Sequence, residues 1–143
     1  MTPAEVLPFL SAAELVTLSP YLSERSLAPG ELFFREGERD ELVAFVLSGR
    51  LAVRKPTEFP GRWQTIALLD AGAVVGERGV LDHGQHGSTV VALEETRLLL
   101  LAHDGFVQLT HGAPGIAIAI LRHLLSVTSL RLQKTSQRLS LVL

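Results

Sequence analysis

The chain has 143 residues, of which 47% are hydrophobic and 20% are charged, and its formal net charge at pH 7 is −2. This length suits one domain, and the weakly acidic balance gives no overall basic footprint for a nucleic acid. The absence of cysteine excludes disulfides, thiolate metal sites and thiol nucleophiles. The sequence has no uninterrupted apolar run of about 18 residues and no basic and apolar leader at its start. We therefore expect a cytoplasmic protein that does not enter a membrane.

A short helix is predicted near the N-terminus, beginning near Ala12. Apolar residues between Phe9 and Leu22 recur near helical spacing. Ser11, followed three residues later by Glu14, forms a capping box. We assign residues 1–28 to an N-terminal helical part.

Short apolar runs separated by turn residues fill the middle of the chain. The runs are residues 32–34, 43–47, 51–53, 65–69, 89–93 and 98–101. Turn signals such as Pro29-Gly30, Ser48-Gly49 and Pro60-Gly61 lie between them. This regular spacing predicts a barrel or jelly roll over residues 29–105.

The pattern changes again after Pro114, because no glycine or proline follows Gly115. We assign residues 106–143 to C-terminal helices, including one long helix. Seven of its residues recur at alternating four- and three-residue steps, which is the spacing of a coiled-coil stripe. The stripe consists of Leu121, Leu125, Thr128, Leu132, Thr135, Leu139 and Val142. It predicts a symmetric homodimer, and the alternative is a monomer whose helix folds back onto its own β-roll.

Two motifs in the middle region carry a family resemblance. Residues 34–38 (FREGE) precede residues 43–53 (VAFVLSGRLAV), and residues 75–92 begin with VGERGVL and end with HGSTVVA. The first motif looks like the opening strands of cyclic-nucleotide-binding domains, as found in bacterial catabolite-activator-type regulators and kinase regulatory subunits. The second resembles that family's phosphate-binding cassette. The resemblance implies one mainly β domain over residues 1–143, a double-stranded β-helix (jelly roll) with a short N-terminal and a long C-terminal helix.

The resemblance also implies a ligand pocket at residues 75–92, which we call the cassette. In the family, free N–H groups of a short helix face the cyclic phosphate. By motif position, Gly76 allows close approach of the backbone and Glu77 accepts a hydrogen bond from the ribose 2′-hydroxyl. The alternative for Glu77 is a favourable place in the first turn of any helix. The candidate ligand-binding residues are Gly76, Glu77, Arg78, Gly79, His86, Gly87, Ser88, Thr89, Thr135 and Ser136.

The cassette departs from the family at its arginine, because His86 occupies the position of the residue that neutralises the phosphate. Arginine offers a permanent charge and a fork of donors, whereas histidine is mostly neutral at pH 7. Charge-assisted hydrogen bonds contribute about 1.5–3 kcal/mol each, so we expect affinity to be weaker by about tenfold to a hundredfold or more. Arg78 is a candidate replacement, and its alternative is an exposed side chain paired with Glu77 or Asp82.

Four further residues in the resemblance remain open in their interpretation. Thr89, or Ser88 beside it, falls where the family places a hydroxyl or small residue near the phosphate or base. Residues 131–136 resemble the stretch of catabolite-activator-type helices whose Thr-Ser pair reaches the purine from both subunits. Thr135 and Ser136 stand at that pair, and the alternative is that Thr135 only adjusts packing of the stripe.

Other function classes lack their motifs. The five histidines include no His-x-His pair on a strand, so we predict no cupin-type metal site. There is no Gly-x-Ser-x-Gly elbow and no phosphate loop ending in Gly-Lys-Ser/Thr, so we do not expect an enzyme. The sequence given ends where a helix-turn-helix domain would begin, so direct nucleic-acid binding is not expected either.

The leading hypothesis is a dimeric regulatory module that senses a ligand without a cofactor. It is expected to bind cAMP, cGMP or another small anion weakly, because His86 replaces the cassette arginine. The alternative is a protein-interaction or adaptor module that has lost nucleotide binding.

Overall fold

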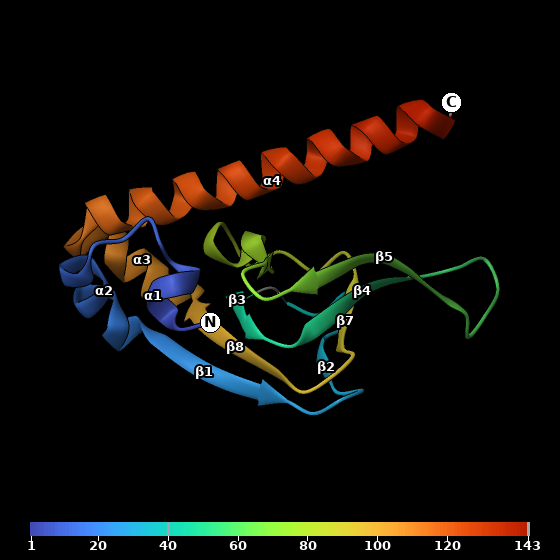
Figure 1. The fold of residues 1–143 in the computed structure, drawn as a ribbon, viewed down its shortest axis with the longest axis horizontal. Coiled ribbons are helices and arrows are strands. Elements are labelled where there is room, and N and C mark those ends of the chain that lie inside the picture. The colour runs from blue at the N-terminus through green and yellow to red at the C-terminus, as the bar shows by residue number, and fades with distance from the viewer. Residues whose placement is uncertain (40, 143) are drawn as a thin grey trace.

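The computed structural model describes residues 1–39 and 41–142 and shows a β-roll flanked by helices (Figure 1). Its strands form two four-stranded sheets in which neighbouring strands are antiparallel. The first sheet contains, in order, β1 (Leu22–Leu27), β8 (Thr96–Ala102), β3 (Leu42–Ser48) and β6 (Val74–Val75). The second contains β2 (Leu32–Phe34), β7 (Thr89–Ala92), β4 (Arg50–Pro56) and β5 (Trp63–Asp70). The predicted jelly-roll fold is confirmed.

Strand β3 shows why the core has two layers. Ala44 and Val46 pack into the interior of the roll, whereas Val43, Phe45 and Leu47 pack against the helices. Successive side chains of a strand point to opposite faces. Because both faces of this strand are covered, it appears in the sequence as an unbroken apolar run and not as an alternating one.

The N-terminal region is only partly helical. Helix α2 (Ala12–Leu18) begins where predicted, and the capping box is present: Ser11 Oγ accepts from Glu14 N at 3.1 Å, and Ser11 N donates to Glu14 Oε1 at 2.9 Å. Helix α1 (Pro3–Val6) and the 3₁₀ turn η1 (Ser19–Tyr21) flank it. The assignment of all of residues 1–28 to a helical part is wrong, because β1 begins at Leu22. This edge strand exposes most of its side chains, so its sequence lacks the apolar pattern of a strand.

The C-terminal region consists of α3 (His103–Gly112) and α4 (Pro114–Val142), which confirms the predicted long helix. Figure 1 shows α4 in orange and red, running along one side of the roll. Its early apolar residues Ile116, Ala117, Ile120 and Leu124 are buried. Among the described helices, α4 is long and apolar enough to cross a membrane, a criterion that core helices of water-soluble proteins also meet.

Candidate functional site

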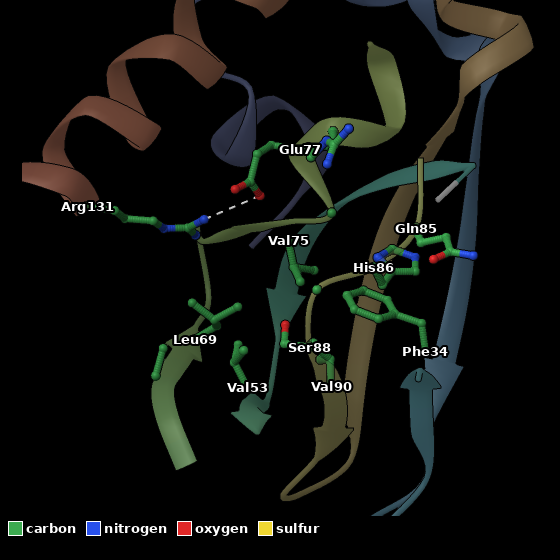
Figure 2. Close-up of a pocket in the computed structure, with 14 residues that line it drawn as sticks. Phe34, Val53, Leu69, Val75, Glu77, Gln85, His86, Ser88, Val90 and Arg131 are labelled. Atoms are coloured by element: carbon green, nitrogen blue, oxygen red, sulfur yellow. Dashed lines mark hydrogen bonds and ion pairs between the residues drawn. The ribbon is translucent and has the colours of Figure 1, made fainter. Parts of the chain in front are cut away.

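A hollow of about 340 Å³ lies between the roll, the cassette and α4 (Figure 2). Its apolar lining comes from Phe34, Val53, Ala67, Leu69, Val75 and Val90. Its more polar wall is formed by Gly76, Glu77, Arg78, Gln85, His86, Gly87, Ser88 and Arg131. The combination of an apolar floor and a few converging polar groups is typical of small-molecule sites.

The start of the cassette is shaped by Gly76. This residue precedes the 3₁₀ turn η2 (Glu77–Val80) and has φ 73° and ψ 33°, in the left-handed region. Glycine adopts this conformation without the steric penalty of a Cβ, so the chain turns sharply from β6 into η2. The predicted short helix of the cassette is therefore present, and Gly76 and Glu77 lie in the lining of the hollow.

Gly79, predicted as a ligand-binding residue, lies outside the lining of the hollow. It is buried against β3, where an added Cβ would approach the carbonyl carbon and oxygen of Leu42 to 2.5 Å. Glycine at this position therefore permits close packing of η2 on the first sheet, which explains its place in the motif.

Glu77 forms an ion pair with a residue that the sequence analysis did not select. Arg131 of α4 places Nη1 at 3.5 Å from Glu77 Oε2 (Figure 2). Its Nη2 also donates a hydrogen bond to the carbonyl oxygen of Val74. About a third of each side chain remains exposed. The pair joins the cassette to the C-terminal helix and places a permanent positive charge in the wall of the hollow.

His86 lies in the wall as a neutral aromatic group. Its ring stacks on Phe34 with centroids 3.5 Å apart and an angle of 7° between the planes. Its backbone N donates to Glu38 O at 2.8 Å, and its carbonyl accepts from Gly37 N at 2.9 Å. Burial lowers the pKa of His86, and the nearby Glu38 opposes this shift only in part. At pH 7 the imidazole thus lacks the charge that an arginine would supply.

Arg78 takes the arrangement that the sequence analysis gave as its alternative. Its Nη2 lies 3.2 Å from Asp82 Oδ2, and 56% of its side chain is exposed. Although Arg78 contributes to the edge of the hollow, Asp82 already offsets its charge. A replacement of the missing cassette arginine by Arg78 is therefore not what the structure shows.

Ser88, which directly precedes β7, and Thr89, the first residue of β7, have different surroundings. Ser88 lines the hollow, as does Val90 two positions later. Thr89 is absent from that lining, and its buried Oγ1 accepts a hydrogen bond from Glu36 N at 3.1 Å. Of the two candidates, only Ser88 therefore faces the hollow.

Thr135 and Ser136 lie on the exposed part of α4, outside the lining of the hollow. In the stripe, Leu125, Leu132 and Leu139 are 68%, 66% and 56% exposed, and Thr128 and Thr135 are exposed as well. Leu121 differs, because it packs against the core of its own roll. The contact of Thr135 and Ser136 with a ligand thus stays a prediction that requires a second copy of the chain.

Phe34 and Arg131 were missed for different reasons. Phe34 belongs to the first quoted motif but lies 52 positions from His86 in the sequence, and only the pairing of β2 with β7 brings the two segments together. Arg131 is the first residue of the stretch 131–136, in which only Thr135 and Ser136 were selected as candidates for the site. The sequence could have indicated Arg131 as a candidate, because a long basic side chain can reach from a helix face to an acidic partner.

The fold and the hollow define a β-roll domain with a long C-terminal helix beside its cassette, and comparison with known proteins specifies it further. The family model described as "Cyclic nucleotide-binding domain" matches residues 24–112. The chain belongs to this family.

Individual relatives agree with the family assignment. The chain is 30% identical over 132 residues to a "Cyclic AMP receptor protein" of Thermus thermophilus, covering 92% of this chain and 59% of that protein. It is 29% identical to a "cAMP-dependent protein kinase regulatory subunit" of Mycosarcoma maydis, covering 75% of this chain and 21% of that protein. The chain thus spans less than two thirds of the length of these curated relatives.

Solved structures show the same fold. A cyclic nucleotide-binding domain from Methylobacillus flagellatus superposes with a TM-score of 0.84 at 25% identity, covering 94% of this chain and 80% of that one. The Thermus thermophilus catabolite activator protein superposes with a TM-score of 0.77 at 26% identity, covering 96% of this chain and 62% of that one.

Proposed function

We propose that the protein is a cytoplasmic regulatory module that acts by binding and not by catalysis, and that its hollow takes cAMP, cGMP or another small anion with low affinity. The observation that carries this proposal is the Arg131 guanidinium, which enters the wall of the hollow from α4. A guanidinium binds phosphate oxygens through two parallel donors. Arg131 therefore supplies the permanent charge that His86 lacks.

The Glu77–Arg131 pair suggests how binding reaches α4. A cyclic nucleotide that engages Glu77 with its ribose and Arg131 with its phosphate exchanges the direct ion pair for contacts through the ligand. Because the two residues lie on different elements, the exchange changes how α4 is held against the cassette. Such a ligand shifts a population only if it prefers one of the two arrangements.

Homodimerisation through α4 is part of the proposal. Its support is the row of exposed leucines in the stripe, Leu125, Leu132 and Leu139, which repeats at the seven-residue interval of a coiled coil. In a dimer, the exposed Thr135 and Ser136 of one copy become candidates for contact with the ligand of the other.

Calorimetric titration of cAMP and cGMP into the protein tests the ligand. We expect weak binding at pH 7 and tighter binding at about pH 5, where a larger fraction of His86 is protonated. Glu77→Gln should weaken binding, whereas Glu58→Gln, at an exposed position in the loop between β4 and β5, should not. The absence of heat at millimolar nucleotide at both pH values would refute cyclic-nucleotide binding.

Nucleotide binding by His86→Arg tests whether the pocket is intact except for the missing charge of the cassette arginine. We expect this variant to bind about tenfold to a hundredfold more tightly than the wild type, as the gain of charge-assisted hydrogen bonds predicts. If neither form binds, the pocket is not a nucleotide site.

One observation favours the second candidate function, a ligand-free interaction module. The charge of Arg131 is already offset by Glu77, and that of Arg78 by Asp82, so the hollow is electrostatically satisfied without an anion. If the protein is an interaction module, cellular partners should bind the wild type and Glu77→Gln equally well. A pull-down with the wild type and with Glu77→Gln measures this.

A further inference from the structure

Two histidines and one carboxylate from distant parts of the chain meet outside the hollow. His83 follows η2, whereas His103 and Asp104 are the first two residues of α3. One possible ligand atom from each side chain lies within 4.8 Å of the others, and the imidazole rings have centroids 4.3 Å apart. Ligand atoms around a tetrahedral zinc ion lie about 3.3 Å apart, given bond lengths near 2.0–2.2 Å. Since His83 and Asp104 are exposed, small rotations of their side chains suffice to reach that spacing.

The hydrogen bonding of His103 suits a metal ligand. Its Nδ1 lies 3.0 Å from the carbonyl oxygen of Gly79, and a carbonyl oxygen can only accept, so Nδ1 carries the proton. The lone pair is then on Nε2. Metal-binding histidines commonly donate their other ring N–H to a backbone carbonyl, which fixes both tautomer and ring orientation. The bond to Gly79 thus prepares His103 for an ion before any ion binds.

The loop that carries His83 is held on both sides. Asp82 Oδ1 accepts a hydrogen bond from Gly84 N at 2.8 Å, which closes a tight turn around His83. The same carboxylate group accepts from Arg78, with Nη2 at 3.2 Å from Oδ2. Asp82 is therefore occupied in shaping the loop, and His83 remains the side chain that this turn presents toward His103.

We propose that His83, His103 and Asp104 bind a divalent transition-metal ion of the zinc type, with water completing the coordination. The two imidazoles are borderline donors that suit zinc better than calcium or magnesium, and a single carboxylate oxygen is a common third zinc ligand. The bound ion ties the loop after η2 to the start of α3, and so holds the segment that leads to His86. None of the three donors lines the hollow, so this proposal does not depend on nucleotide binding. The earlier expectation of no metal site considered only histidines alternating on a strand, whereas these donors come from a loop and a helix start.

Co²⁺ and Zn²⁺ titrations of the tag-free full chain, stripped of metal with EDTA and dialysed, test the site. We expect one Co²⁺ per chain with the visible absorption bands of low coordination number, and displacement of Co²⁺ by Zn²⁺. His83→Ala should lower Zn²⁺ affinity by about tenfold or more, the range of losses known for metal-site residues. His111→Ala is the matched control, because His111 is an exposed histidine of α3 outside the cluster, and it should leave the affinity unchanged.

A second variant guards against a purely structural effect. His103→Ala also removes the bond to Gly79, so we use His83→Cys, whose thiolate is itself a zinc ligand. This variant should retain Zn²⁺ binding and acquire a near-ultraviolet sulfur-to-cobalt charge-transfer band that the cysteine-free wild type cannot show. The proposal is overturned if the wild type binds no metal, if His83→Ala binds as tightly as the wild type, or if His86→Ala and not His83→Ala abolishes binding.

Discussion

The two halves of α4 carry similar apolar residues but have different surroundings. In the first half, Ile116, Ile120 and Leu124 are about 5%, 1% and 5% exposed against the roll. In the second half, Leu132 and Leu139 are more than half exposed. Helical periodicity therefore identifies an apolar face but not what covers that face. The first half completes the core of its own domain, whereas the exposed leucines of the second half are the proposed dimer interface.

The largest effect is expected in the first half of α4. Ile120→Ala should reduce the free energy of unfolding by about 2–5 kcal/mol, because truncation leaves a cavity in a closely packed core. Ile118, in the same half, is 56% exposed, and Ile118→Ala should change stability by less than about 0.5 kcal/mol. Urea denaturation measures both variants. If Ile120→Ala and Ile118→Ala reduced the free energy of unfolding equally, the buried face of the first half would not be the source of its contribution to stability.

In the second half, Leu132→Glu should disrupt association. Placing a charge in the predicted interface should raise the dimer dissociation constant by at least about tenfold and leave the stability of the domain nearly unchanged. Leu141, 87% exposed and outside the stripe, provides the control Leu141→Glu, which should not alter association. Sedimentation velocity over a range of concentrations measures this, and a wild type that stays monomeric at all of them contradicts the dimer.

The first half of α4 also contains a histidine that makes stability depend on pH. His123 stacks on Phe9 with centroids 4.6 Å apart, its Nε2 is buried without a hydrogen-bond partner among the described residues, and burial lowers its pKa. The unfolded state therefore binds the proton more readily, so the free energy of unfolding should fall as pH drops below about 6.5. The lowered pKa of His86 acts in the same direction.

Replacement of His123 measures how much this residue contributes to the pH dependence of the free energy of unfolding. His123→Phe preserves an aromatic ring beside Phe9 and should flatten the loss of stability between about pH 7.5 and 5.5. His111→Phe, at an exposed position, should leave the loss as it is in the wild type. Urea denaturation at each pH provides the comparison, and an unchanged slope in His123→Phe would contradict the assignment.

The smallest effect is expected at the boundary between the halves, at Arg131. Its ion pair with Glu77 is a third exposed, so Arg131→Ala should cost less than about 1 kcal/mol of stability. Arg138→Ala, at an exposed position seven residues later in α4, should reduce the free energy of unfolding still less. Thermal unfolding compares the two variants. A loss of several kcal/mol would show that the pair is an essential part of the fold.

The sequence predicted the parts of the site that are contiguous. Gly76, Glu77, His86 and Ser88 belong to one motif, so their proximity follows from a short stretch of chain. Arg131 lies 54 positions after Glu77, and its role depends on where α4 crosses the roll. The three residues of the proposed metal site were missed for the same reason, since His83 and His103 come together through the packing of η2 against α3.

By itself, the sequence determined the jelly roll, the start of α2, the long C-terminal helix and the cassette. The roll of short strands, the start of α2 and the long helix follow from local spacing of apolar, turn and capping residues, whereas the cassette was implied by the resemblance of its motif to a known family. Only the tertiary structure decided that β1 is a strand, that Ser88 rather than Thr89 faces the hollow, and that Arg131 lies in the wall of the hollow beside Glu77. Each of these depends on contacts between distant segments, and such contacts leave no periodic signal in a single sequence.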